Sequence, residues 1–181
     1  MEVEVKFPYS RDAEEKVRKI AKPVAEKFEH DVYFSHPCRD FALTDEAIRI
    51  RRDAEGITLT YKGPKVDAET KSREEIKVRV DDFDAASRIF EKLGFKPVAE
   101  VKKIRRIYGF EDAIICIDDV EGLGKFVEIE IEAENLEVKE KVFQIARLLG
   151  YSKNDSIRES YLELILQKKL RKDPSKTGQK S

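Results

Sequence analysis

The sequence predicts an α+β fold in which eight antiparallel strands form a barrel with a charged lumen, flanked by helices and followed by a C-terminal helix. Several segments alternate charged and apolar residues with a period of two, which is typical of half-buried strands. The segments between them carry apolar residues at helical spacing. With 181 residues, the chain is long enough for one domain with a substantial core, and its sheet is long enough to curl into a barrel.

The strands are predicted from this alternation. Residues 2–7 place three charged side chains on one face and three apolar side chains on the other. A Glu55-Gly56 turn separates two alternating segments, and a glycine-containing hairpin turn at residues 122–124 separates two more. We expect strands over residues 2–7, 31–34, 48–51, 58–62, 73–80, 103–105, 114–120 and 126–132.

The helices are predicted from apolar stripes between the strands. We expect them over residues 12–28, 82–93, 137–149 and 157–170. Pro23 should kink the first helix or begin a second piece, whereas Gly94 and Gly150 should end the second and third helices. A single domain then spans residues 1–170, and the polar residues 171–181 are expected to form a disordered tail.

The composition excludes several classes of protein. Charged residues make up 40% of the chain, but 36 lysines and arginines are balanced by 37 aspartates and glutamates. The resulting net charge of −1 argues against a nucleic-acid-binding protein. No apolar run reaches the roughly 20 residues of a membrane span, and no signal-peptide pattern is present, so we expect a cytoplasmic protein. Two cysteines cannot build a disulfide framework, and the lysine and glutamate enrichment is typical of a thermophile.

The charged faces of the predicted strands carry the functional signal. They form either an outer face with cross-strand ion pairs or a lumen in which the charged faces meet. The lumen is favoured because helices that cover the apolar faces leave the charged faces to one another. The acidic members are Glu2, Glu4, Glu75, Asp118, Glu128 and Glu130. The basic members are Lys6, Arg49, Arg51, Lys62, Arg73, Lys77, Arg79, Lys103 and Arg105.

Charges of one sign recur two residues apart in these strands. Glu128 and Glu130 repel each other unless a cation lies between them, and carboxylate pairs suit hard cations such as Mg²⁺ or Mn²⁺. Arg49 and Arg51 repel each other unless an anion bridges them, and arginine pairs suit phosphate groups. A lumen that holds both kinds of pair is a candidate site for a metal-bound polyphosphate.

The same segments resemble, in chain order, the motifs of the CYTH family, the triphosphate tunnel metalloenzymes. The resemblance begins with Glu2-x-Glu4-x-Lys6, which is similar to the family's ExExK signature. The other similar segments are residues 31–34, 47–51, 59–64, 73–75, 103–105, 120–130 and 160–164. This resemblance implies an eight-stranded antiparallel tunnel, open at both ends, that binds a triphosphate and a divalent metal inside.

The resemblance also implies a role for each matching residue. Five carboxylates would bind the metal and act in catalysis, namely Glu2, Glu4, Asp118, Glu128 and Glu130. Seven cationic side chains would bind the triphosphate, namely Lys6, Arg49, Arg51, Lys62, Arg73, Lys103 and Arg105. Glu75 matches an acidic lumen position of uncertain role. Lys77 stands where the resemblance leads us to expect an acidic residue.

Three functions are compatible with such a lumen. A class IV-type adenylyl cyclase, which residues 120–130 and 160–164 resemble most, converts ATP to cyclic AMP and pyrophosphate. A triphosphatase would hydrolyse tripolyphosphate, thiamine triphosphate or a nucleoside triphosphate. A non-catalytic module would bind nucleotide or polyphosphate without turnover. The pattern of charged residues itself indicates a binding site for a metal and a polyanion. Only the resemblance implies the cyclase reaction.

The remaining reactive side chains are expected to have structural roles. His30 and His36 are expected in loops or at the surface, Cys116 is expected to fill space in the lumen, and Tyr161 is expected to pack on a helix. An exposed strand edge or the helix over residues 157–170 is a candidate surface for a homodimer.

Overall fold

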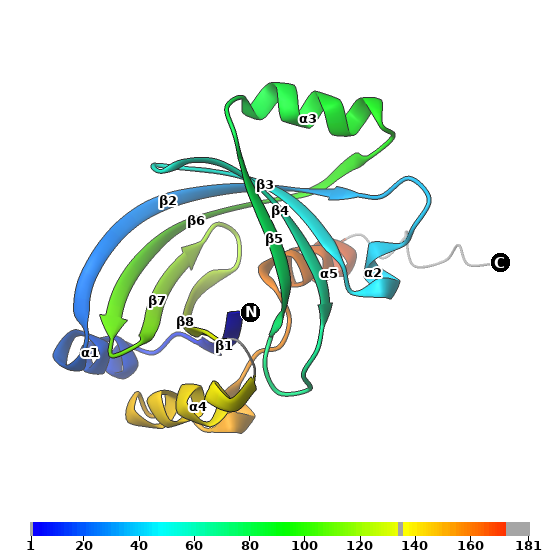
Figure 1. Ribbon diagram of the computed structural model, residues 1–181. Helices are drawn as coiled ribbons and strands as arrows, with labels where there is room; N and C mark the ends of the chain where they lie inside the picture. The colour runs from blue at the N-terminus through cyan, green and yellow to red at the C-terminus, as the bar shows by residue number, and fades with distance from the viewer. Residues whose placement is uncertain (1, 134–135, 173–181) are drawn as a thin grey trace.

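The computed structural model describes residues 2–133 and 136–172, and it confirms the predicted barrel (Figure 1). In this part of the chain, eight antiparallel strands pair in the closed order β1-β5-β4-β3-β2-β6-β7-β8, and β8 pairs with β1. The strands are β1 (Glu2–Pro8), β2 (Lys22–Ser35), β3 (Ala47–Asp53), β4 (Gly56–Lys65), β5 (Arg73–Val80), β6 (Lys96–Phe110), β7 (Ala113–Val120) and β8 (Gly124–Glu132). Because the barrel is closed, the charged faces of its strands point into one interior.

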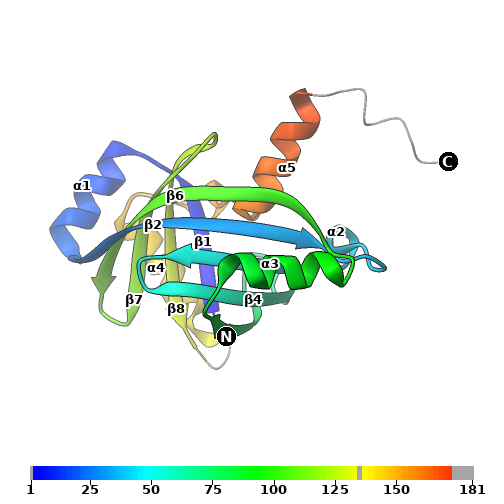
Figure 2. The same ribbon diagram turned by 90° about the horizontal axis from the view of Figure 1, so that it is seen from above.

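The helices lie outside the barrel, as Figures 1 and 2 show. They are α1 (Arg11–Ile20), α2 (Phe41–Thr44), α3 (Phe83–Lys92), α4 (Lys139–Leu148) and α5 (Tyr161–Lys172), with 3₁₀ turns at Leu136–Val138 and Lys153–Asp155. Among the described residues, none of these helices is long and apolar enough to cross a membrane. The predicted homodimer stays a prediction.

The prediction of a helix over residues 12–28 is wrong beyond α1. The helix ends at Ile20, and β2 begins at Lys22 and pairs with β6 along its whole length. Val24 and Phe28, which helical spacing places on a buried stripe, are 66% and 55% exposed on the outside of β2. Cross-strand pairing therefore overrides the local periodicity, since β2 pairs with β6 from Lys22 to Ser35 apart from bulges.

Other boundaries also differ from the predictions. The short strands predicted at residues 31–34 and 103–105 are the inner parts of β2 and β6, which have 14 and 15 residues. The last helix begins at Tyr161 and includes two residues that were assigned to the disordered tail, Arg171 and Lys172. The rest of the predicted tail, residues 173–181, lies outside the described residues.

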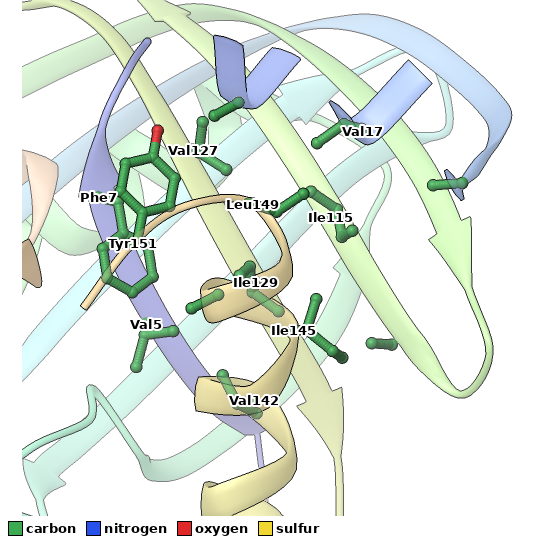
Figure 3. Packing of buried hydrophobic residues seen from close by; sticks show 14 of the residues in the cluster. Val5, Phe7, Val17, Ile115, Val127, Ile129, Val142, Ile145, Leu149 and Tyr151 are labelled. Atoms are coloured by element: carbon green, nitrogen blue, oxygen red, sulfur yellow. The ribbon is translucent and has the colours of Figure 1, made fainter. Parts of the chain in front are cut away.

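The main hydrophobic core lies outside the barrel, between the strands and the helices α1 and α4 (Figure 3). Val3, Val5 and Phe7 alternate with the charged residues of β1 and are fully buried in this core. Phe7 stacks on Tyr151 with 4.6 Å between ring centroids. A second apolar layer, which includes Phe34 and Ile50, packs under α3. Because these layers take the apolar parities, the charged parities are left facing inward.

The seam between β1 and β5 is the shortest contact of the barrel. One residue pair, Glu2 with Arg73, joins the two strands in register, whereas β1 and β8 pair along all of β1. The seam is extended by the connection before β5, where the Lys71 N–H donates to the Glu4 carbonyl oxygen at 2.9 Å. This backbone contact places Lys71 beside the interior of the barrel.

The carboxylate of Glu14 on α1 ties the helix to the barrel. It accepts hydrogen bonds from the Tyr9 hydroxyl at 2.6 Å, from Arg18 at 2.8 Å and from Arg106 on β6 at 2.7 Å. Burial alone would raise the pKa of Glu14, but the hydrogen bonds from Tyr9 and Arg18 and the charge of Arg106 outweigh it and lower the pKa to about 2.

We expect this network to make the free energy of unfolding depend on pH, with stability lost in acid. The lowered pKa means that Glu14 stabilises the fold above its unfolded value of 4.5, and that the stabilisation is lost as pH falls from there to about 2. Urea unfolding at a series of pH values should show E14Q less stable than wild type at neutral pH, with a gap on the order of 2 kcal/mol that closes in acid. E15Q, which changes the neighbouring exposed carboxylate, should keep the wild-type pH dependence. A gap for E14Q that is constant with pH would contradict the assignment.

Candidate active site

The barrel encloses a cavity of about 120 Å³, into which most of the predicted site residues point. The predicted residues that line it are Glu2, Glu4, Arg49, Arg51, Lys62, Arg73, Glu75, Lys103, Arg105, Glu128 and Glu130. Lys77 also lines the cavity, together with Asp31, Tyr33, Ala47, Lys71, Ser160, Tyr161 and Leu162. Alternate residues of seven strands thus face the same cavity.

One side of the cavity is acidic and is formed by the neighbouring strands β1 and β8. Glu4 lies opposite Glu130 in the register of the two strands. Burial and the neighbouring Glu128 raise the pKa of Glu4 to about 7, and burial and Glu2 raise the pKa of Glu130 to about 8. Burial contributes most to both shifts, and repulsion between the neighbouring carboxylates adds to it.

Lys71 provides the positive charge for this acidic side. Its ammonium donates to Glu4 and, at 2.7 Å, to Glu128. Burial alone would raise the pKa of Glu128, but Lys71 and Arg105 outweigh it and hold that pKa well below its usual value. Sequence reasoning missed Lys71, although it shares the inward parity of Arg73. Extension of the β5 alternation by two residues would have found it.

The acidic side has the chemistry of a divalent-cation site. Its carboxylate oxygens are the donors that Mg²⁺ and Mn²⁺ prefer, and a cation already stands between Glu4 and Glu128 in the form of the Lys71 ammonium. In the part of the chain that is described, no three Asp, Glu, His or Cys side chains converge as a metal-binding group. The donor chemistry of these carboxylates suits a hard cation, and in this geometry the Lys71 ammonium supplies the positive charge between Glu4 and Glu128.

Most cationic side chains of the cavity come from β3, β4, β5 and β6, and among them Arg105 reaches Glu128 of the acidic side. Arg51 forms a two-point ion pair with Asp31, at 2.6 and 2.7 Å, and also contacts Glu29 at 2.7 Å. Arg49 contacts Asp31 at 3.6 Å. Its buried Nε has no hydrogen-bond partner among the described residues. Since a buried unpaired donor is costly, Arg49 is prepared to receive an anion.

Two of the predicted residues, Asp118 and Lys6, lie behind the cavity wall and are fully buried. Both oxygens of Asp118 accept hydrogen bonds from Arg105, at 2.8 and 2.6 Å. The Lys6 ammonium donates to the Glu159 carbonyl oxygen and lies 4.3 Å from the centre of the Tyr161 ring. Burial and the neighbouring Lys71 lower the pKa of Lys6 to about 7. In this structure Asp118 is therefore bonded to a side chain of the cavity wall, and Lys6 contacts the backbone and an aromatic ring of that wall.

Tyr161 packs at the start of α5, as predicted, but its hydroxyl also has a polar partner. It donates to Asp118 Oδ2 at 2.8 Å, and the Tyr161 ring lies 5.0 Å from the Lys103 ammonium. Burial, with the charges of Glu128 and Asp118, raises the pKa of Tyr161 well above its usual value. The first turn of α5 thus forms part of the cavity wall.

Sequence reasoning also missed the acidic partners of the cationic wall. Glu29 follows the segment that was predicted to be helical, and Asp31 was quoted within a motif but received no role. Both are buried, and Glu29 lies 3.2 Å from the Lys103 ammonium. Lys77, at the position where an acid was expected, contacts Glu75 at 3.1 Å and Glu2 at 3.6 Å. It brings a positive charge to the acidic side of the cavity.

The other reactive side chains lie away from the candidate active site or are unreactive. Cys116 is buried, and burial raises the pKa of its thiol, which suits a space-filling side chain better than a nucleophile. His30 contacts Glu100 at 2.9 Å on the outside of the barrel. The His36 ring lies between those of Phe41 and Phe95.

Comparisons with known proteins agree with this architecture. The profile of the CYTH domain matches residues 1–161. A curated relative from Methanocaldococcus jannaschii, described as "Putative adenylate cyclase MJ0240", is 44% identical over 169 residues, which are 91% of this chain and 97% of the relative. "Adenylate cyclase CyaB" from Aeromonas hydrophila is 31% identical over 142 residues, 75% of this chain and 71% of the relative. The solved structure of the PH1819 protein from Pyrococcus horikoshii is 42% identical, with a TM-score of 0.85, and the match covers 93% of this chain and 99% of that one.

Proposed function

Because the chain belongs to the CYTH domain family, we propose that it is a cytoplasmic, divalent-metal-dependent enzyme that acts on a triphosphate inside the barrel. Its favoured reaction is the conversion of ATP to cyclic AMP and pyrophosphate, and its metal is Mg²⁺ or Mn²⁺. The names of the two curated relatives support the cyclase reaction.

The observation that carries this proposal is that one cavity holds both a cluster of carboxylates on β1 and β8 and a larger set of cationic side chains. The carboxylates suit a divalent cation, and the cationic side chains suit the oxygens of a polyphosphate. A triphosphate with its metal would satisfy both sets together, including the unpaired Arg49 Nε. The enclosed position strengthens these interactions, because charges attract more strongly away from bulk water.

In the cyclase reaction, the oxygen of the ribose 3′-hydroxyl forms a bond to the α-phosphorus. The bond from that phosphorus to the oxygen it shares with the β-phosphate breaks, pyrophosphate leaves, and the hydroxyl proton is released to water. Lys103 and Arg105, positioned by Asp118, and Arg51, positioned by Asp31, stabilise the negative charge that develops on pyrophosphate. The divalent cation, when bound, neutralises phosphate charge and lowers the pKa of the nucleophile.

The cavity also favours a second candidate reaction, triphosphate hydrolysis. Its volume of about 120 Å³ suits a polyphosphate without an attached organic group. Water would then attack a terminal phosphorus, and the same cationic side chains would stabilise the leaving phosphate. The two reactions differ in which phosphorus lies in line with the nucleophile.

A product profile tests both reactions. The purified protein is incubated warm with ATP and with Mg²⁺ or Mn²⁺, and the products are resolved by anion-exchange chromatography. We expect cyclic AMP and pyrophosphate. ADP with free phosphate, or turnover of tripolyphosphate only, would replace the cyclase with the triphosphatase. No turnover of either substrate, with metal-strengthened binding retained, would identify the non-catalytic module instead.

A further inference from the structure

The strand β5 has a free edge over most of its length. On one side it pairs with β4 without interruption from Glu75 to Val80, but on the other side it meets β1 only where Arg73 lies opposite Glu2. From there β5 continues to α3 (Figure 1). Among the described residues, no other strand pairs with residues 74–80 on the β1 side. Unpaired N–H and C=O groups along such an edge are a template for pairing with another strand.

The outer face of this edge is apolar and uncovered. Ile76 and Val78 are 57% and 53% exposed, although the apolar layer under α3 covers residues of the neighbouring β4. Edge strands are commonly protected by a proline, a bulge or inward charges. β5 has no proline, and its pairing with β4 is regular from Glu75 to Val80. Its inward charges do not mark it as protected, because inward charges are the rule in this barrel.

The sequence of the edge is complementary to itself in the antiparallel direction. Two copies can meet about a two-fold axis through Lys77. Ile76 of each copy then lies opposite Val78 of the other, which continues the apolar face. Glu75 lies opposite Arg79, which brings opposite charges together on the inward face. Residues directly opposite across antiparallel strands have their Cβ atoms about 4.5–5.5 Å apart, so both kinds of pair are stabilising.

Moving the two-fold axis by one residue breaks this complementarity. With the axis at Val78, Lys77 lies opposite Arg79 and repels it. With the axis at Ile76, the two edges overlap as far as Arg73, which β1 already pairs. The axis at Lys77 is therefore the register that the charges and the free length of the edge both favour.

A contact in this register also reaches the lumen. Glu75 lines the barrel cavity, where it contacts Lys62 and, at 3.1 Å, Lys77. Arg79 shares the inward parity of these residues, but it is exposed and does not line the cavity of its own chain. Across the axis, Arg79 of one copy would lie beside Glu75 of the other and extend that copy's cavity wall.

We propose that two copies of the chain form a symmetric dimer through their β5 edges, antiparallel about Lys77, in which each copy supplies Arg79 to Glu75 of the other. Such a two-fold contact is closed, because the same patch serves both copies and none is left for a third. The inference does not depend on the triphosphate, so its failure would leave the proposed function untouched.

Sedimentation velocity over a range of concentrations tests the dimer. We expect wild type to be dimeric at micromolar concentration and I76E/V78E to be monomeric. R79E should dimerise roughly tenfold more weakly, because its new carboxylate would face Glu75 in both symmetric pairs. The matched control is V24E, since Val24 lies on the outside of β2 and is 66% exposed. This variant should dimerise like wild type.

Cysteine substitution tests the register. In a C38A background, which removes the exposed native cysteine, K77C should form a disulfide-linked dimer under mild oxidation. The two copies of residue 77 face each other across the axis, within the Cα separation that a disulfide spans. R79C is the control, because its two copies lie four residues apart along the paired strands. That separation is roughly 13 Å, too far for a disulfide.

Three results would overturn the proposal. Wild type that stays monomeric throughout the concentration range is the first. The second is a dimer that R79E and I76E/V78E leave as stable as V24E does, because another surface would then hold the copies together. The third is a cross-link with R79C and none with K77C, which would fix a different register. Since the substituted β5 side chains are exposed, circular dichroism should show each variant folded.

Discussion

Replacing Glu128 and Glu130 together with glutamine should reduce metal-dependent turnover at least about a thousandfold while the barrel stays folded. Glutamine keeps the shape of each side chain but removes the negative charge that a divalent cation needs. The loss should appear in two measurements, the rate of product formation and the affinity for Mn²⁺. Circular dichroism should show wild-type secondary structure, because the outward-facing apolar residues of β8 are unchanged.

The matched control is E132Q, which changes the next glutamate of the same parity on β8. Glu132 is exposed and does not line the cavity, so this variant should keep both turnover and metal affinity. Normal turnover by the E128Q/E130Q variant would show that the acidic side of the cavity does not carry the metal-dependent chemistry.

Replacing Lys71 with methionine should have the second large effect, on stability. Without the ammonium, the carboxylates of Glu4 and Glu128 are left close together and buried. Removal of one partner from a buried ion pair typically costs about 3–5 kcal/mol. We therefore expect the metal-free variant to unfold at markedly lower denaturant concentration, and Mg²⁺ to restore more stability to it than to wild type.

Denaturant unfolding with and without Mg²⁺ checks this prediction, with K125M as the control. Lys125 is an exposed lysine whose ammonium lies 4.0 Å from Asp119, so its loss should change little in either condition. If Mg²⁺ stabilised K71M and wild type equally, the ammonium and the divalent cation would not be acting on the same carboxylates.

The barrel and much of its lining could be predicted because strand alternation is a local property. In β1 and β8, each inward charge is flanked by outward apolar residues, as is Arg49 in β3, so parity alone separates the two faces. The assignment of Glu4 and Arg49 to one interior follows from that parity once the sheet closes. The roles that the resemblance gives to these residues stay predictions.

The parts that sequence reasoning missed depend on contacts between distant segments. Val17, Ile20, Val24 and Phe28 have the spacing of one apolar face of a helix. Local periodicity alone therefore predicts a helix here. Only pairing with β6 decides in favour of a strand and turns Glu29 inward. A second cavity, of about 810 Å³, is likewise invisible in the sequence, since its walls come from the end of β2, from α2 and the chain before it, and from α5.

The ion pairs that line the lumen bear on which anions the proposed site would accept. Lys62 with Glu75, Arg51 with Asp31, and Lys71 with Glu128 neutralise one another before any ligand enters. An incoming anion must therefore compete with carboxylates that are already well placed. A single phosphate group, with a charge of about −1.5 to −2 at neutral pH, replaces few of them, whereas a triphosphate offers more negative oxygens along the same wall. If the barrel binds a triphosphate as proposed, this charge balance should favour long phosphate chains over monophosphates.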